Sequence, residues 1–122
     1  MNELVHPYHR FIRPTVTHSS FCPGCGDGTI AQSILRAIDG LGMDMDDFVF
    51  VSGIGCAAWI PSPLFNADVF HTTHGRPIAF AFGVKMGLPD KKVMVVSGDG
   101  DLVAIGGNHL IQNARRNIEM VV

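Results

Sequence analysis

The sequence has 122 residues and a formal net charge of −2 at pH 7, with 47% hydrophobic and 16% charged residues. This composition excludes a disordered chain. The nine basic residues are not clustered in the sequence, which argues against a nucleic-acid-binding surface. No apolar stretch approaches the ~20 residues that a bilayer crossing needs and no secretory signal is visible, so we expect a cytoplasmic protein with no membrane partner.

The first half of the chain predicts an arm, a helix and a buried strand. Residues 1–20 contain scattered prolines and histidines and are typical of an irregular N-terminal arm, which leaves 21–122 as the domain proper. Apolar residues at helical spacing predict a helix over 27–39, which ends at a glycine-rich turn. The short, apolar and β-branched segment 47–52 is typical of a buried parallel strand.

In the second half, residues 53–74 are expected to form a turn and a loop, and a helix is expected at 75–87. A second strand is expected at 92–97, a helix at 101–116 and the start of a third strand at 118–122. Strands that alternate with helices predict an α/β fold, a parallel sheet with helices on both faces. Such sheets bind ligands beyond the carboxyl ends of their strands. Because the sequence ends inside the last expected strand, we expect the domain to be truncated at its C-terminal end and the fold to be incomplete.

Gly98-Asp99-Gly100 follows the strand predicted at 92–97 and precedes a predicted helix. A magnesium–diphosphate site needs a hard oxygen ligand, and it gains from glycines that let the backbone approach phosphate oxygens. It also gains from a helix N-terminus, whose N–H groups and dipole favour an anion. This segment supplies all three. The alternative is an ordinary strand-to-helix turn in which the aspartate caps the helix.

Cys22, Cys25 and Cys56 form a C-x-x-C pair and a distant third thiol. In a reducing compartment, such an odd set indicates a metal or redox site rather than disulfides. Thiolates suit an iron–sulfur cluster. The spacing equally allows a zinc site completed by His18 or His71, a thioredoxin-like dithiol, or buried inert thiols.

The longer string GDGDLVAIGGNHLIQNARRNI, which starts at Gly98, resembles the β subunits of 2-oxoacid:ferredoxin oxidoreductases, and the resemblance extends over 20–122. It implies the thiamine-diphosphate-binding fold of the PP type. It also implies oxidative decarboxylation of a 2-oxoacid to an acyl-CoA and CO₂, with electrons passing through a [4Fe–4S] cluster to ferredoxin. The run Ala-Ile-Gly-Gly-Asn-His favours the 2-oxoglutarate type over enzymes for pyruvate or branched-chain oxoacids.

The resemblance assigns roles to individual residues. Asp99 is the expected Mg²⁺ ligand, and Cys22, Cys25 and Cys56 are the expected protein ligands of the [4Fe–4S] cluster. The residues expected to contact thiamine diphosphate lie in the predicted turns: Ile54, Gly55, Cys56, Ala57, His74, Gly98, Asp99, Gly100 and Asp101.

The resemblance also implies that this chain works with partners. Its only glutamates are Glu3 and Glu119, and neither is placed to hydrogen-bond the aminopyrimidine of thiamine. We therefore expect no catalytic residue on this chain and a glutamate from the α subunit. The fourth cluster cysteine and the asparagine that closes the thiamine motif are expected beyond Val122, so the isolated 122 residues are expected to be inactive.

Ferredoxin, the 2-oxoacid and coenzyme A are the other expected partners. Two other classes of protein stay open. One is a zinc- or nucleotide-binding α/β module, and the other is a C-x-x-C thiol redox protein.

Overall fold

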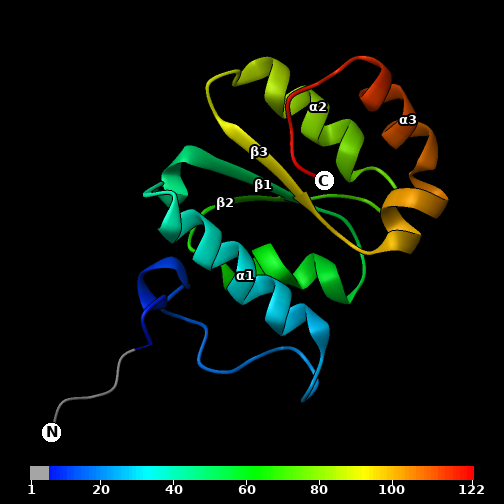
Figure 1. Cartoon of the computed structure of the whole chain (residues 1–122). Coiled ribbons are helices and arrows are strands. Elements are labelled where there is room, and N and C mark those ends of the chain that lie inside the picture. The colour runs from blue at the N-terminus through cyan, green and yellow to red at the C-terminus, as the bar shows by residue number, and fades with distance from the viewer. Residues whose placement is uncertain (1–5) are drawn as a thin grey trace, which may run out of the picture.

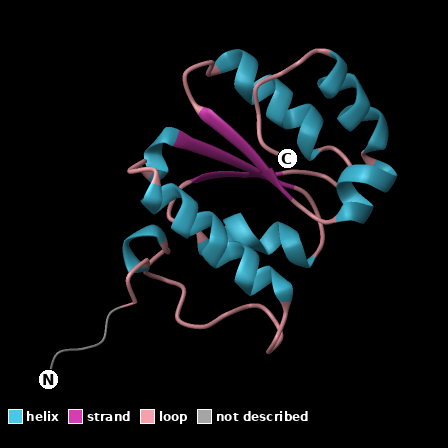
Figure 2. Ribbon diagram, in the orientation of Figure 1, coloured by secondary structure: helices cyan, strands magenta, loops and turns pink. Residues whose placement is uncertain are grey.

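The computed structural model describes residues 6–122 as a three-stranded parallel sheet with helices on both faces (Figure 1, Figure 2). The strands are β1 (Phe48–Ser52), β2 (Asp68–His71) and β3 (Lys92–Val96), in the order β2–β1–β3. This arrangement confirms the predicted α/β class.

The strand β1 is the centre of the sheet, with β2 and β3 paired to it in parallel on either side. All five of its residues are buried, as expected for a central strand covered on both faces. Successive side chains point to opposite faces. Phe50 and Val51, both 0% exposed, accordingly belong to two separate cores.

The first core lies between the sheet and α1 (Gly26–Gly40), which ends before a left-handed turn at Gly42. Three buried positions of α1 repeat at helical spacing: Ala31, Leu35 and Ile38. Phe50 packs edge-on against Phe65, with 5.1 Å between the ring centroids. Aromatic packing of this kind adds to the stabilisation from buried area.

The N-terminal arm packs against this first core, although residues 1–5 of the predicted arm lie outside the described part. Within residues 6–20, a 3₁₀ turn forms at His9–Phe11. Phe11 is buried in the core. Arg13 donates hydrogen bonds to the carbonyl oxygens of Phe65, at 2.7 Å, and Ala67, at 2.9 Å. These bonds tie the arm to its own chain.

The second core lies on the opposite face, under α2 (Pro77–Gly87) and α3 (Gly107–Arg115) (Figure 1). Its buried members are Val51, Ile78, Ala81, Val93, Val95 and Leu102. The helix α2 begins two residues later than predicted. Pro77 occupies the first turn, where a missing N–H costs nothing, and Gly75 before it has a left-handed φ of +75°.

Two elements differ from the sequence prediction. The segment 64–74, predicted to be a loop, contains the edge strand β2, whose residues are mostly exposed and carry little apolar patterning. The helix predicted at 101–116 is divided into a π-helical turn at Gly100–Ile105 and α3. Gly106 separates them, and a Cβ there would lie 2.5 Å from the Asp101 carbonyl oxygen.

The strand predicted at 118–122 is reduced to a single parallel bridge between Val121 and Met94 at the free edge of β3. Val121 accepts a hydrogen bond from Val95 N at 2.8 Å and donates one to Val93 O at 3.0 Å. Val121 therefore pairs with β3 in parallel, the orientation expected for a strand of this sheet.

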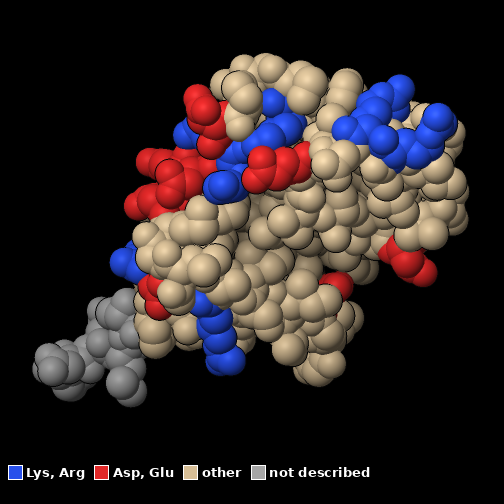
Figure 3. Space-filling model, turned by 45° about the horizontal axis from the view of Figure 1, so that its top comes forward, with Lys and Arg blue, Asp and Glu red and all other residues tan. Residues whose placement is uncertain are grey.

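Charged side chains occupy small separate groups on the face that Figure 3 shows, and most of that face is uncharged. This distribution agrees with the absence of a basic stripe in the sequence. None of the helices in residues 6–122 has the length and apolar character that a bilayer crossing requires.

Candidate functional site

The turns that follow the three strands meet at one edge of the sheet, because parallel strands place their carboxyl ends together. These turns are 53–56, 72–76 and 97–101, and most of the predicted site residues lie in them. At the ends of β1 and β2, Ser52 Oγ lies 2.8 Å from His71 Nδ1, and Thr72 N donates to Ser52 O at 2.7 Å.

The carboxylate of Asp101 joins all three turns. Its Oδ2 atom accepts hydrogen bonds from Ser97 Oγ at 2.6 Å and Ile54 N at 3.3 Å. Its Oδ1 atom accepts from the Gly75 amide and pairs with His74 Nδ1. The expectation that Asp101 lines the diphosphate stays a prediction. The residue is only 2% exposed, so its carboxylate lies beneath the turns.

These hydrogen bonds explain why Asp101 carries its charge inside the protein. Burial raises the pKa of the Asp101 carboxyl, because a charged group is less stable away from water. The carboxylate also accepts hydrogen bonds from Ser97 and His74 and from the backbone amides of Gly75 and Ile54. Their stabilising effect exceeds the cost of burial, so the pKa of Asp101 lies below the ordinary value of 3.8. The structure therefore holds a buried anion under the candidate site.

Two residues that support this carboxylate are not among those that the sequence pattern singles out. Ser97 provides the short hydrogen bond. Gly53 provides space, because a Cβ at this position would lie 1.7 Å from Asp101 Oδ2 and 2.7 Å from its Cγ. A glycine directly after a buried strand can indicate that another group packs closely against the backbone there. The sequence does not indicate which group, because Asp101 lies 48 positions further along.

Asp99 differs from Asp101 in its surroundings. It is exposed at the start of the π-helical turn, and no side-chain hydrogen bond caps that turn. The alternative that Asp99 is simply a helix cap is therefore not supported. Gly98 and Gly100 face open space, because a Cβ added at either position would meet nothing within 4 Å. A ligand can thus approach the backbone on both sides of the Asp99 carboxylate.

His74 stands beside this exposed surface, with its side chain 48% exposed. A carboxylate can only accept a hydrogen bond, so Nδ1 carries the proton that it shares with Asp101. Nε2 is then the ring nitrogen left for a ligand. Ile54, Gly55 and Cys56 are exposed in the neighbouring turn, while Ala57 is half-buried.

The three cysteines are free thiols. Cys22 and Cys56 are exposed, and Cys25 is half-buried with its Sγ 3.5 Å from Asp27 Oδ2. Among residues 6–122, no group of three or more His, Cys, Asp or Glu side chains is arranged to hold a metal ion. Cys56 does share a cavity with Ser20 and Phe21, which come directly before Cys22.

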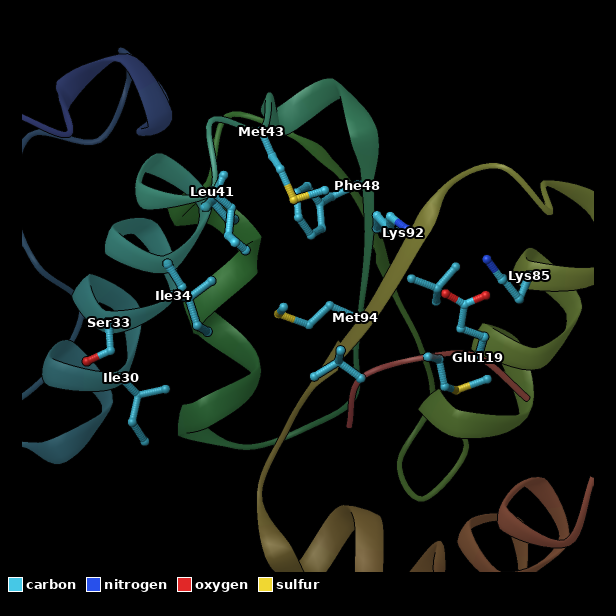
Figure 4. Close-up of a pocket in the computed structure, with 15 residues that line it drawn as sticks. Ile30, Ser33, Ile34, Leu41, Met43, Phe48, Lys85, Lys92, Met94 and Glu119 are labelled. Atoms are coloured by element: carbon cyan, nitrogen blue, oxygen red, sulfur yellow. The ribbon is translucent and has the colours of Figure 1, made fainter. Parts of the chain in front are cut away.

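A separate cavity in the described residues lies away from these turns. It is an apolar groove of about 600 Å³ between α1, the free edge of β3 and residues 119–121. Figure 4 shows Ile30 and Ile34 of α1 on one side of the groove and Met94 of β3 across from them. Glu119 lies in its wall, but none of the predicted cofactor residues does. The groove is therefore separate from the candidate site in the turns at the carboxyl ends of the strands.

The fold and the turn around Asp99 define an α/β domain with a carboxylate and open glycines at the carboxyl edge of a parallel sheet. Residues 53–122 match the family described as thiamine pyrophosphate enzyme, C-terminal TPP binding domain. The chain belongs to this family of thiamine pyrophosphate enzymes.

Within that family, the chain is similar to subunits of one kind of oxidoreductase. It is 49% identical to 2-oxoglutarate synthase subunit KorB of Methanocaldococcus jannaschii over 118 residues, which cover 97% of this chain and 43% of that protein. It is 47% identical to 2-oxoacid:ferredoxin oxidoreductase subunit beta of Sulfolobus sp, over 85% of this chain and 34% of the relative. The chain thus spans less than half the length of these relatives.

A solved structure shows the same fold. It is a 2-oxoglutarate:ferredoxin oxidoreductase from Magnetococcus marinus with 2-oxoglutarate, coenzyme A and succinyl-CoA bound. The TM-score is 0.85 at 38% sequence identity, with 93% of this chain and 38% of the other chain covered. The predicted resemblance and the predicted thiamine-diphosphate-binding fold are confirmed by these similarities.

Proposed function

We propose that this chain forms the thiamine-diphosphate-binding part of a β subunit of 2-oxoacid:ferredoxin oxidoreductase, with 2-oxoglutarate as its favoured substrate. The observation that carries the proposal is Asp99, an exposed and uncapped carboxylate between two open glycines at the carboxyl edge of a parallel sheet. The membership of the chain in the thiamine pyrophosphate enzyme family supports thiamine diphosphate as the cofactor.

The residues of the strand edge fit a metal-bound diphosphate. Asp99 would bind Mg²⁺, which prefers hard oxygen ligands, while Gly98 and Gly100 leave the backbone open to phosphate oxygens. His74 would present Nε2 to the cofactor. Ile54, Gly55, Cys56 and Ala57, in the turn after β1, would contact the thiamine. When bound, thiamine diphosphate supplies the electron sink for decarboxylation.

Cys22, Cys25 and Cys56 would supply three thiolates to a [4Fe–4S] cluster. The support is their spacing, the softness of thiolate ligands and the shared cavity between Cys56 and the residues before Cys22. The described thiols are not gathered around one centre. A complete cluster would also need a fourth ligand from outside this chain segment.

The reaction and its partners follow from the relatives. Four of the relatives are 2-oxoglutarate synthase subunits, and the solved relative holds 2-oxoglutarate and coenzyme A. We propose an α subunit that supplies the glutamate for the aminopyrimidine, and ferredoxin as electron acceptor. Glu119 lies in the apolar groove, away from the strand edge, so the described residues offer no glutamate for that role.

The test uses the full-length β subunit co-purified with its α subunit under anaerobic conditions. Oxidation of 2-oxoglutarate and of pyruvate is followed by coenzyme-A-dependent reduction of ferredoxin, and bound thiamine diphosphate, iron and acid-labile sulfide are quantified. We expect turnover with 2-oxoglutarate, stoichiometric cofactor, and loss of iron and sulfide in Cys22→Ser. Asp99→Asn should lose bound thiamine diphosphate while keeping its iron.

A matched control is Asp90→Asn, which changes an exposed aspartate in the turn before β3 and should retain both cofactor and iron. The proposal is wrong if the assembled protein binds zinc or a nucleotide and ignores thiamine diphosphate. Reduction of a disulfide substrate that depends on Cys22 and Cys25, without oxoacid turnover, would instead identify a thiol redox protein.

A further inference from the structure

We propose that Asp101 is a positioning residue: from beneath the site, its buried carboxylate sets the orientation of His74 and of the turns after β1 and β2 toward the cofactor. This inference rests on the proposed function of the strand edge. It gives Asp101 a role through other residues rather than through contact with the cofactor.

The hydrogen bonds of Asp101 reach every turn of the candidate site. Ile54 N lies in the turn after β1, the Gly75 amide in the turn after β2, and Ser97 Oγ at the end of β3. The strands hold the three turns near one another, but strand pairing stops at Ser52, His71 and Val96. Beyond those residues, the Asp101 side chain accepts hydrogen bonds from all three turns.

The same carboxylate determines how His74 meets a ligand. The bond from His74 Nδ1 to Asp101 Oδ1 fixes the tautomer and the plane of an otherwise half-exposed ring. Carboxylates that bind the far nitrogen of a ligand histidine commonly orient the ring in this way. Without Asp101, the ring could rotate and either nitrogen could face the cofactor.

Glycines leave the space that the carboxylate and the neighbouring turns occupy. The space beside Asp101 Oδ2 exists because residue 53 is a glycine, whose missing Cβ would lie 1.7 Å from that oxygen. Gly75, whose amide donates to Asp101, has a φ of +75°, and a Cβ at this position would lie 2.2 Å from Ile105 Cγ2. Gly53 and Gly75 thus allow the close packing of the two turns that donate backbone hydrogen bonds to Asp101.

The test measures the affinity for thiamine diphosphate by isothermal titration calorimetry, at saturating Mg²⁺, on the full-length β subunit assembled with its α subunit. Asp101→Asn keeps the volume but replaces an acceptor with a donor. Gly53→Ala displaces the carboxylate without changing its chemistry. We expect each to weaken binding by about 10- to 100-fold, as when supporting partners of a ligand are removed. Gly40→Ala, which faces open space at the end of α1, should leave affinity unchanged.

A double-mutant cycle separates positioning from a general loss of structure. If Asp101 acts through His74, Asp101→Asn should cost much less affinity in a His74→Gln background than in the wild type. An equal cost in both backgrounds, or no cost in a folded Asp101→Asn variant, would overturn the inference. Should Asp101→Asn not fold, Ser97→Ala removes only one of the four hydrogen bonds and serves in the same cycle.

A cofactor-free measurement distinguishes this inference from the proposed function. Amide hydrogen exchange should be faster at Ile54 and Gly75 in Asp101→Asn than in the wild type, because both amides donate to Asp101. This result can hold even if the assembled wild type fails to bind thiamine diphosphate, which would refute the proposed function alone. Unchanged exchange at both amides would refute the anchoring role itself.

Discussion

Asp99 and Asp101 lie two residues apart in one turn, yet their environments are opposite. Asp99 is exposed and caps nothing, whereas Asp101 is 2% exposed and accepts hydrogen bonds from three turns. A carboxylate that is free at the surface can bind an ion, and a carboxylate that is saturated by protein donors can hold backbone in place. The comparison shows that one short sequence motif can contain both the ligand and its support.

The largest expected effect is on stability. Asp101→Ala should lower the free energy of unfolding by about 3–5 kcal/mol, because it leaves buried donors without an acceptor. Asp99→Ala, measured without cofactor, should leave it unchanged, since Asp99 has no cap bond to lose. Urea denaturation of the full-length protein measures both. Equal destabilisation by the two substitutions would contradict the distinction between them.

Glycines provide a second, smaller contrast. Gly75→Ala should destabilise by about 2 kcal/mol, because it introduces a Cβ in a left-handed conformation and against the Ile105 side chain. Adding Ile105→Ala should restore the part that comes from the clash. Gly98→Ala meets open space and should leave the melting temperature unchanged. Loss of stability in Gly98→Ala, measured by thermal unfolding, would show that this position is packed rather than open.

The smallest expected effect is a pH dependence confined to acid. The pKa of Asp101 is below 3.8 in the folded chain, so its charged form stabilises the fold above the unfolded pKa, and that stability is lost as pH falls through the folded pKa. The difference in free energy of unfolding between the wild type and Asp101→Asn should therefore be constant from pH 7 to about pH 5 and become smaller below about pH 5. A decline that begins near neutral pH would mean that burial outweighs the hydrogen bonds.

Sequence pattern predicts those parts of the fold that depend on local signals. The apolar run of β1 and the helical spacing in α1 each specify an element without reference to distant residues. The edge strand β2 escapes prediction because only one side is paired and most of its residues are exposed. The break at Gly106 escapes it because the break depends on close approach of the Gly75 carbonyl, 3.1 Å from a Cβ at that position.

For the candidate site too, sequence pattern predicts the local features but not the contacts between distant residues. Asp99 and its glycines are recognisable because a diphosphate site has a short, continuous signature. The anchoring by Asp101 is not, since Ile54 lies 47 residues away and His74 lies 27 residues away in sequence. Only the folded sheet places those turns side by side. The cysteine cluster stays a prediction, because its thiols are not gathered in the described residues.

The most direct test of the account is the position of the metal relative to these two aspartates. Crystals of the full-length assembly, grown with thiamine diphosphate and Mn²⁺ in place of Mg²⁺, would locate the ion by its anomalous scattering. The account predicts an ion bound to an Asp99 carboxylate oxygen, with the Asp101 bonds to Ser97, His74 and the two backbone amides intact. An ion on Asp101, or one away from Asp99, would contradict it.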